Sequence, residues 1–185
     1  MLPPIVGLSG HSGSGKSTAI DHLRAISGGE RVYLGSAVLA EVTRRGLPQN
    51  RESEREVRVA MREEYGEACL VAASLGAIQS HLDAGRPVFI DAIFCPEEFD
   101  RLQAAFGSIR VLRLEASFDV RAARLRTRTD RPFSIEELAK RDRTEAERLG
   151  TANVFADAAF SIVNEGDLGS LHSALELWWR EVTNA

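Results

Sequence analysis

The chain has 185 residues, 44% of them hydrophobic and 27% charged, with a formal net charge of −4 at pH 7. This length favours a single domain over residues 1–185 that buries about 70% of its unfolded surface. The acidic balance argues against binding nucleic acid over the whole surface, and the two cysteines lack metal-like spacing. No apolar run approaches the roughly 18 residues of a membrane span, so we expect a cytoplasmic protein without membrane contact.

The first chemical signal is residues 10–17, which follow a strand-like apolar run and precede a helix-like segment, residues 18–26. They fit the pattern G-x-x-x-x-G-K-S/T in full. In such a loop backbone N–H groups surround phosphates, Lys16 reaches the β and γ phosphates, and the Ser17 hydroxyl binds Mg²⁺. The pattern predicts binding of a nucleoside triphosphate, taken as ATP, with Mg²⁺. The residues expected to contact it are Gly10, His11, Ser12, Gly13, Ser14, Gly15, Lys16, Ser17 and Thr18.

Further along, the pattern predicts a strand at 31–34, a helix at 36–45 and a long helical stretch at 50–84 that Gly66 bends or divides. Ser53 and Glu56 are expected to form a capping box at its start.

A third strand, residues 87–90, ends at Asp91. There a carboxylate would face the phosphate loop, holding Mg²⁺ through water or accepting a proton from an attacking hydroxyl. The alternative is that Asp91 only caps the next helix.

The remaining pattern alternates helices with two more strands, at 109–114 and 160–163. Ser134 and Glu137 form a second predicted capping box. The predicted helices are 96–106, 120–128, 134–149 and 168–182. Strands separated by helices throughout predict an α/β fold, with a parallel sheet covered on both faces and ligands bound at its carboxyl edge.

Five arginines within residues 121–131 are the second chemical signal. Arginines on a mobile segment can neutralise a transferring phosphoryl group, so residues 124–140 are predicted to form a lid. Three of them share a helix face or lie in the turn beyond it: Arg124, Arg128 and Arg131. A solvated helix face is an equally good interpretation of Arg121 and Arg126.

Arg141 and Arg143 flank Asp142 on the following helix. Either could approach the same phosphates or form surface ion pairs, and Arg143 is slightly favoured.

Taken in order, these motifs resemble the small P-loop kinases related to nucleoside monophosphate kinases and dephospho-CoA kinase, especially the archaeal nucleotide kinases of that group. The resemblance spans nearly the whole chain. Besides the phosphate loop it rests on residues 44–47, 62–66, 88–91, 141–145, 156–157 and 164–166. It implies a three-layer P-loop NTPase sandwich, a five-stranded sheet in the order 2-3-1-4-5, a helical lid, and an acceptor-binding segment at 36–84. In relatives the turn that matches Asn164 and Gly166 lies beside the nucleotide base.

The departures from this pattern concern the acceptor. Ser36 stands where relatives commonly have Asp, and Leu39 and Phe94 replace arginines that grip the acceptor's phosphate in many relatives. Either Arg62 and Arg58 or Arg44 take over phosphate binding, or the acceptor is not an ordinary nucleoside monophosphate. The predicted acceptor-binding residues are Ser36, Arg62, Phe94 and Arg143.

Together these features predict an ATP-dependent kinase that moves the γ-phosphoryl group to a small nucleotide-like acceptor, in a monomer or homodimer. The predicted catalytic residues are Lys16, Asp91, Arg128 and Arg131. Mg²⁺ would lie between Ser17 and Asp91, and Arg124, Asn164 and Gly166 would contact the nucleotide. Two alternatives stay open: phosphorylation of a hydroxyl on a modified nucleotide, a dephospho-CoA-like molecule or a hydroxymethylated base in DNA, and a regulatory P-loop ATPase. Binding of nucleic acid is not favoured.

Overall fold

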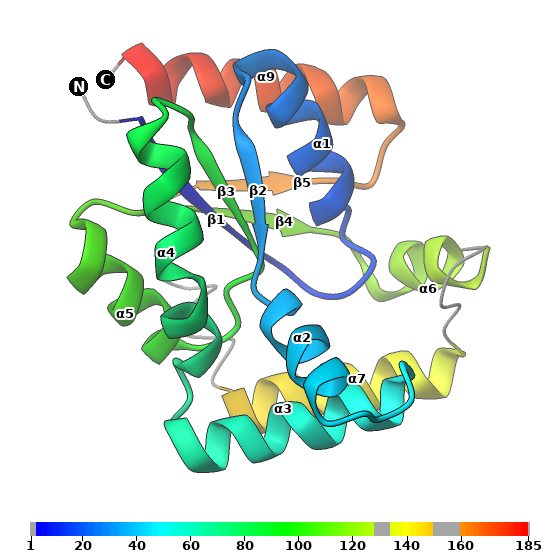
Figure 1. Ribbon diagram of the computed structural model, residues 1–185. Coiled ribbons are helices and arrows are strands. Elements are labelled where there is room, and N and C mark those ends of the chain that lie inside the picture. Colours follow the sequence, from blue (N-terminus) through cyan, green and yellow to red (C-terminus); the bar gives the residue numbers. More distant parts are fainter. Residues whose placement is uncertain (1–2, 128–133, 150–159, 185) are drawn as a thin grey trace.

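Five parallel strands form one sheet in the order β2-β3-β1-β4-β5, as the family resemblance implied. The computed structural model describes residues 3–127, 134–149 and 160–184 (Figure 1). The strands are β1 (Ile5–Ser9), β2 (Glu30–Tyr33), β3 (Val88–Asp91), β4 (Arg110–Glu115) and β5 (Phe160–Val163). The predicted α/β class and strand order are therefore confirmed.

Helices cover both faces of the sheet, which gives three layers (Figure 1). On one face α1 (Lys16–Ser27) packs against α9 (Leu168–Asn184), and on the other α4 (Cys69–Asp83) packs against α5 (Pro96–Phe106). Four more helices gather around the carboxyl ends of the strands: α2 (Ser36–Arg44), α3 (Arg51–Tyr65), α6 (Phe118–Arg126) and α7 (Ile135–Leu149).

Each face of the sheet has its own apolar core, because neighbouring residues of a strand point to opposite sides. Val6 and Leu8 of β1 belong to the core beneath α1 and α9, whereas Ile5 belongs to the core beneath α4 and α5. Every residue of β1 is buried. This central strand therefore gives the loop that follows it a rigid support.

The long predicted helix at 50–84 is two helices, α3 and α4, separated at Gly66, where φ is +85°. The predicted Ser53–Glu56 capping box is wrong. Asn50 caps α3 instead, because its side chain accepts a hydrogen bond from the backbone N–H of Ser53 at 2.9 Å. The second predicted box is confirmed: Ser134 and Glu137 exchange side-chain to backbone hydrogen bonds of 2.8 and 3.1 Å.

Part of the predicted lid, residues 128–133, lies outside the described residues, and residues 135–140 belong to α7. Within the described ranges, no helix combines the length and the apolar character that crossing a bilayer requires.

Candidate functional site

The phosphate loop joins β1 to α1, and its glycines are required by its backbone. Gly10, Gly13 and Gly15 have φ values of +130°, +86° and +102°, which residues with a side chain rarely adopt. A Cβ atom at Gly10 would collide with the backbone oxygen of Leu114, and one at Gly15 with the side-chain amide of Asn164. The loop is thus folded tightly against β4 and the turn after β5.

Several backbone N–H groups of this loop have no acceptor among the residues that the structure describes. They belong to Gly13, Gly15, Lys16 and Ser17, at the point where α1 begins. Unpaired N–H groups at a helix N-terminus, together with the positive end of the helix dipole, bind anions. This backbone fits the phosphates that the sequence predicts.

Lys16 turns its ammonium group back onto the loop. Its Nζ donates hydrogen bonds to the backbone oxygens of Gly10 at 2.6 Å and His11 at 3.1 Å. Burial lowers the pKa of Lys16 from 10.5 to about 8, although the carboxylates of Asp91 and Glu145 act in the opposite direction. The ammonium is therefore desolvated, and two carboxylates favour its charged form, before any phosphate binds.

Asp91 ends β3 beside Leu8 of β1, at the carboxyl edge of the sheet. Its carboxylate is buried and forms an ion pair through Oδ2 with Arg31 of β2. It does not cap the next helix, because Cys95 is the N-cap residue of α5. Sequence reasoning missed Arg31, and its only signal was a charged residue inside a short apolar strand.

The residues predicted to hold Mg²⁺ fit that ion by their chemistry. The Ser17 hydroxyl and the Asp91 carboxylate are oxygen ligands, which Mg²⁺ prefers. Ser17 lies in the first turn of α1, and the pair with Arg31 uses Oδ2 of Asp91, so Oδ1 is left for the ion or its water.

Arg121 of α6 binds the backbone of the phosphate loop. Its guanidinium is buried, donates to the backbone oxygens of Ser12 and Ala116, and forms two hydrogen bonds of 3.1 and 2.6 Å with the carboxylate of Asp142 on α7. The solvated-face interpretation of Arg121 is therefore wrong, whereas Arg126 is exposed. Arg121 joins three separate segments of the chain.

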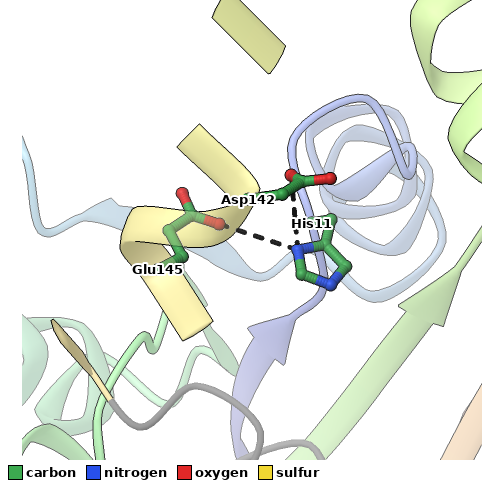
Figure 2. Close-up of side chains that lie close together, drawn as sticks. All are labelled: His11, Asp142 and Glu145. Carbon is green, nitrogen blue, oxygen red and sulfur yellow. Dashed lines mark ion pairs between the residues drawn. The ribbon is translucent and has the colours of Figure 1, made fainter. Parts of the chain in front are cut away.

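His11 also connects the loop to α7 (Figure 2). Its Nδ1 atom lies 3.5 Å from Oδ1 of Asp142 and 3.8 Å from Oε2 of Glu145. Burial acts to raise the pKa of Glu145, but the neighbouring His11 and Arg141 outweigh it, and the pKa is lowered. Glu145 is thus ionised at neutral pH.

The three ligand atoms of His11, Asp142 and Glu145 lie within 4.8 Å of one another, which is close enough to hold a cation. Each carboxylate, however, already has an arginine: Asp142 binds Arg121, and Glu145 accepts a hydrogen bond from Arg141 at 2.7 Å. We interpret the group as a network that ties α7 to the loop.

Three residues predicted to contact the nucleotide are brought together after β5. Arg124 donates to the backbone oxygen of Asn164 at 2.9 Å and to that of Gly166 at 3.5 Å. The Asn164 amide in turn donates to the backbone oxygen of Ser14 at 2.8 Å. The turn, α6 and the phosphate loop therefore form one connected unit.

A cleft of about 250 Å³ opens beside this unit. It is lined by Gly10 and His11 of the loop, residues 113–117, Val163 and Glu165. This is the carboxyl edge of the sheet, where ligands bind in open α/β folds.

Three of the predicted acceptor residues lie around α2, α3 and the start of α5, and each has a hydrogen-bond partner. The Ser36 hydroxyl donates to the backbone oxygen of Tyr33 at 2.6 Å. Arg62 pairs with the buried Glu98 at 3.2 Å, and the Phe94 N–H donates to the same carboxylate at 2.8 Å.

Arg141 and Arg143 of α7 are both exposed, and Arg141 donates a hydrogen bond to Glu145 near the loop. Arg128 and Arg131 lie outside the described residues, so their roles remain predictions.

This architecture is the P-loop kinase-like fold, and solved structures agree. A shikimate kinase from Bacteroides thetaiotaomicron superimposes with a TM-score of 0.61 and 16% identity over 96% of this chain and 98% of that one. A gluconokinase from Sinorhizobium meliloti superimposes with a TM-score of 0.56 and 18% identity over 98% of this chain and 95% of that one. At these identities the likeness shows the fold alone.

Sequence comparison places the chain in a family. Residues 6–150 match an AAA domain. A UPF0200 protein of Pyrobaculum aerophilum is 33% identical over 165 residues, 87% of each chain. A UPF0200/UPF0201 protein of Archaeoglobus fulgidus is 34% identical over 88% of this chain, which spans 50% of that relative. The protein belongs to the UPF0200 family, and its resemblance to P-loop kinases is confirmed.

The structure predicts that Arg121 stabilises the fold. Arg121→Ala should lower the free energy of unfolding by about 2–4 kcal/mol, because it leaves Asp142 and the oxygen of Ser12 without their donors. Urea unfolding measures this change. Arg126→Ala, on the exposed side of the same helix, is the matched control and should change stability by less than about 0.5 kcal/mol. Equal effects of the two substitutions would contradict the assignment.

Proposed function

We propose that this protein is an ATP-dependent, Mg²⁺-requiring kinase that transfers the γ-phosphoryl group to a small nucleotide-like acceptor. The observation that carries this proposal is the phosphate loop, with unpaired N–H groups and a desolvated Lys16 beside a buried strand-end carboxylate. The kinase-like fold supports the same reaction.

In this proposal Lys16 moves its ammonium from the oxygens of Gly10 and His11 to the β and γ phosphates. The loop N–H groups bind the phosphate oxygens and need little rearrangement, because the glycines, Arg121 and Asn164 already fix the loop. Ser17 and Asp91 would hold Mg²⁺, which neutralises charge on the phosphates when it is bound.

In the proposed transfer Asp91 would have a second task. Its carboxylate favours the charged form of Lys16, which supports a role for it near the transferred group. The ion pair with Arg31 keeps the carboxylate in one orientation. It would accept the proton of an acceptor hydroxyl, or orient a metal-bound water when the acceptor oxygen belongs to a phosphate.

Arginines around the site would stabilise the charge on the transferring group. Arg141 acts electrostatically on Lys16 and is held by Glu145. We retain Arg128 and Arg131 as proposed lid residues. Arg124 would act indirectly, because it braces the turn at Asn164.

Acceptor-stimulated ADP formation tests the proposal. We expect one acceptor to raise the rate at least about tenfold over basal hydrolysis, and Lys16→Ala to lower that rate by about 10²-fold or more because the γ phosphate loses its cation. The panel is nucleoside and deoxynucleoside monophosphates, dephospho-CoA, free nucleosides and hydroxymethylated DNA. A slow rate that no acceptor changes would contradict the proposal and favour a regulatory ATPase.

The pKa of Lys16 predicts a proton taken up when ATP binds. At pH 8 about half of the free molecules carry neutral Lys16, and phosphates favour the charged form, so binding should take up roughly half a proton at pH 8 and about a tenth at pH 7. Affinity for Mg²⁺-ATP should accordingly fall as the pH rises above 8. Calorimetry in buffers of different ionisation enthalpy measures the uptake. Lys16→Arg, which stays charged, should lose it, and equal uptake by both proteins would contradict the assignment to Lys16.

A further inference from the structure

Two helices bring positive charge to the region between the phosphate loop and the acceptor segment. α3 and α7 lie side by side (Figure 1), and Arg51 of α3 pairs with Glu137 of α7 at 3.8 Å. Two helical turns after Arg51 comes Arg58, and one turn after Glu137 comes Arg141. Arg141 acts electrostatically on both Arg58 and Lys16. Arg141 therefore lies near both cations, and its partner Glu145 lies beside His11 of the loop.

Arg58 differs from Arg51 and Arg62 of the same helix, which both form ion pairs with carboxylates. Its side chain is half-buried and makes no hydrogen bond or ion pair within the part of the chain that the structure describes. Burial lowers its pKa, and Arg141 and Arg62 act in the same direction, whereas Tyr33 and Glu54 act in the opposite one. A desolvated guanidinium beside other cations has a strong requirement for an anion.

The two other arginines that the sequence offered for the acceptor phosphate already have anionic partners. Arg62 binds the buried Glu98, and the exposed Arg44 binds Glu41 with two hydrogen bonds of 2.6 Å. The sequence left open which of these arginines meets the acceptor. Arg58 alone among the three keeps its planar set of donors available, and that geometry matches a phosphate.

Tyr33, which interacts electrostatically with Arg58, presents an exposed aromatic ring. Its side chain packs against Gly35, where a Cβ atom would collide with the ring. The residue is still 39% exposed, and Arg31 lies 5.8 Å from the ring centroid on its way to Asp91. The apolar part of a ligand held by Arg58 can pack on this ring and stay on the side of the sheet where Asp91 lies.

We infer that Arg58 binds the phosphate group of a phosphomonoester acceptor, between α3 and α7. This inference rests on the proposed kinase function and narrows its acceptor to molecules that already carry a phosphate. It excludes neutral acceptors such as free nucleosides from efficient use.

Binding measured without turnover tests the inference. The probes are nucleoside 5′-monophosphates and the matching nucleosides, titrated by calorimetry in the presence of Mg²⁺ and the β,γ-imido analogue of ATP. For a monophosphate that binds, Arg58→Ala should weaken affinity about 10- to 100-fold and leave the affinity for the ATP analogue unchanged. The matching nucleoside should bind the wild type and the variant equally. Arg58→Lys should restore part of the loss.

Arg55→Ala is the control. Arg55 is exposed on the same helix, and its substitution removes the same charge as Arg58→Ala. Equal losses from Arg55→Ala and Arg58→Ala would overturn the inference, as would a failure of every monophosphate to bind the wild type. If a monophosphate binds in an Arg58-dependent way but no phosphoryl transfer follows, the kinase proposal is refuted and the binding site at Arg58 stands. Efficient transfer to a neutral acceptor, at a rate that Arg58→Ala does not change, would support the proposed kinase function and refute the phosphate site at Arg58.

Discussion

The buried ion pair between Arg121 and Asp142 is the interaction on which the site depends. Through it α6, α7 and the phosphate loop share one set of hydrogen bonds, because the same guanidinium also binds the oxygen of Ser12. His11 adds a contact from the loop to Asp142 and Glu145. The orientation of the loop amides is thus fixed by side chains of α6 and α7, which lie more than 100 residues further along the chain.

The charged side chains around this network are mostly arranged in pairs of opposite sign. Most cations near the loop are matched with a carboxylate, as in the pairs of Arg31 with Asp91 and Arg141 with Glu145. Such pairs keep arginine side chains in place without a ligand, at the cost of desolvating both partners. Lys16 instead donates to the backbone oxygens of Gly10 and His11. In the proposed function it and the loop amides bind phosphate, which would explain how an acidic chain binds polyanions at one edge of its sheet.

Much of the fold was predictable from sequence because local signals and hydrophobic periodicity agree. The loop pattern at residues 10–17 and the apolar run before Asp91 located the strands that carry the site. Long-range partners were not predictable. Arg121 was compatible with a solvated face, since nothing local indicates that Asp142, 21 residues on, folds back to meet it. The cap of α3 was misplaced by three residues, because Asn50 and Ser53 are both good capping residues.

The most direct test of this account is amide hydrogen exchange with and without Mg²⁺ and the β,γ-imido analogue of ATP. If the loop and α7 form one unit, ligand should protect residues 10–17 and 134–145 together, and Arg121→Ala should abolish the protection of the second segment. Protection of the loop without any change in 134–145 would contradict the coupling. No protection of either segment would contradict nucleotide binding at this site.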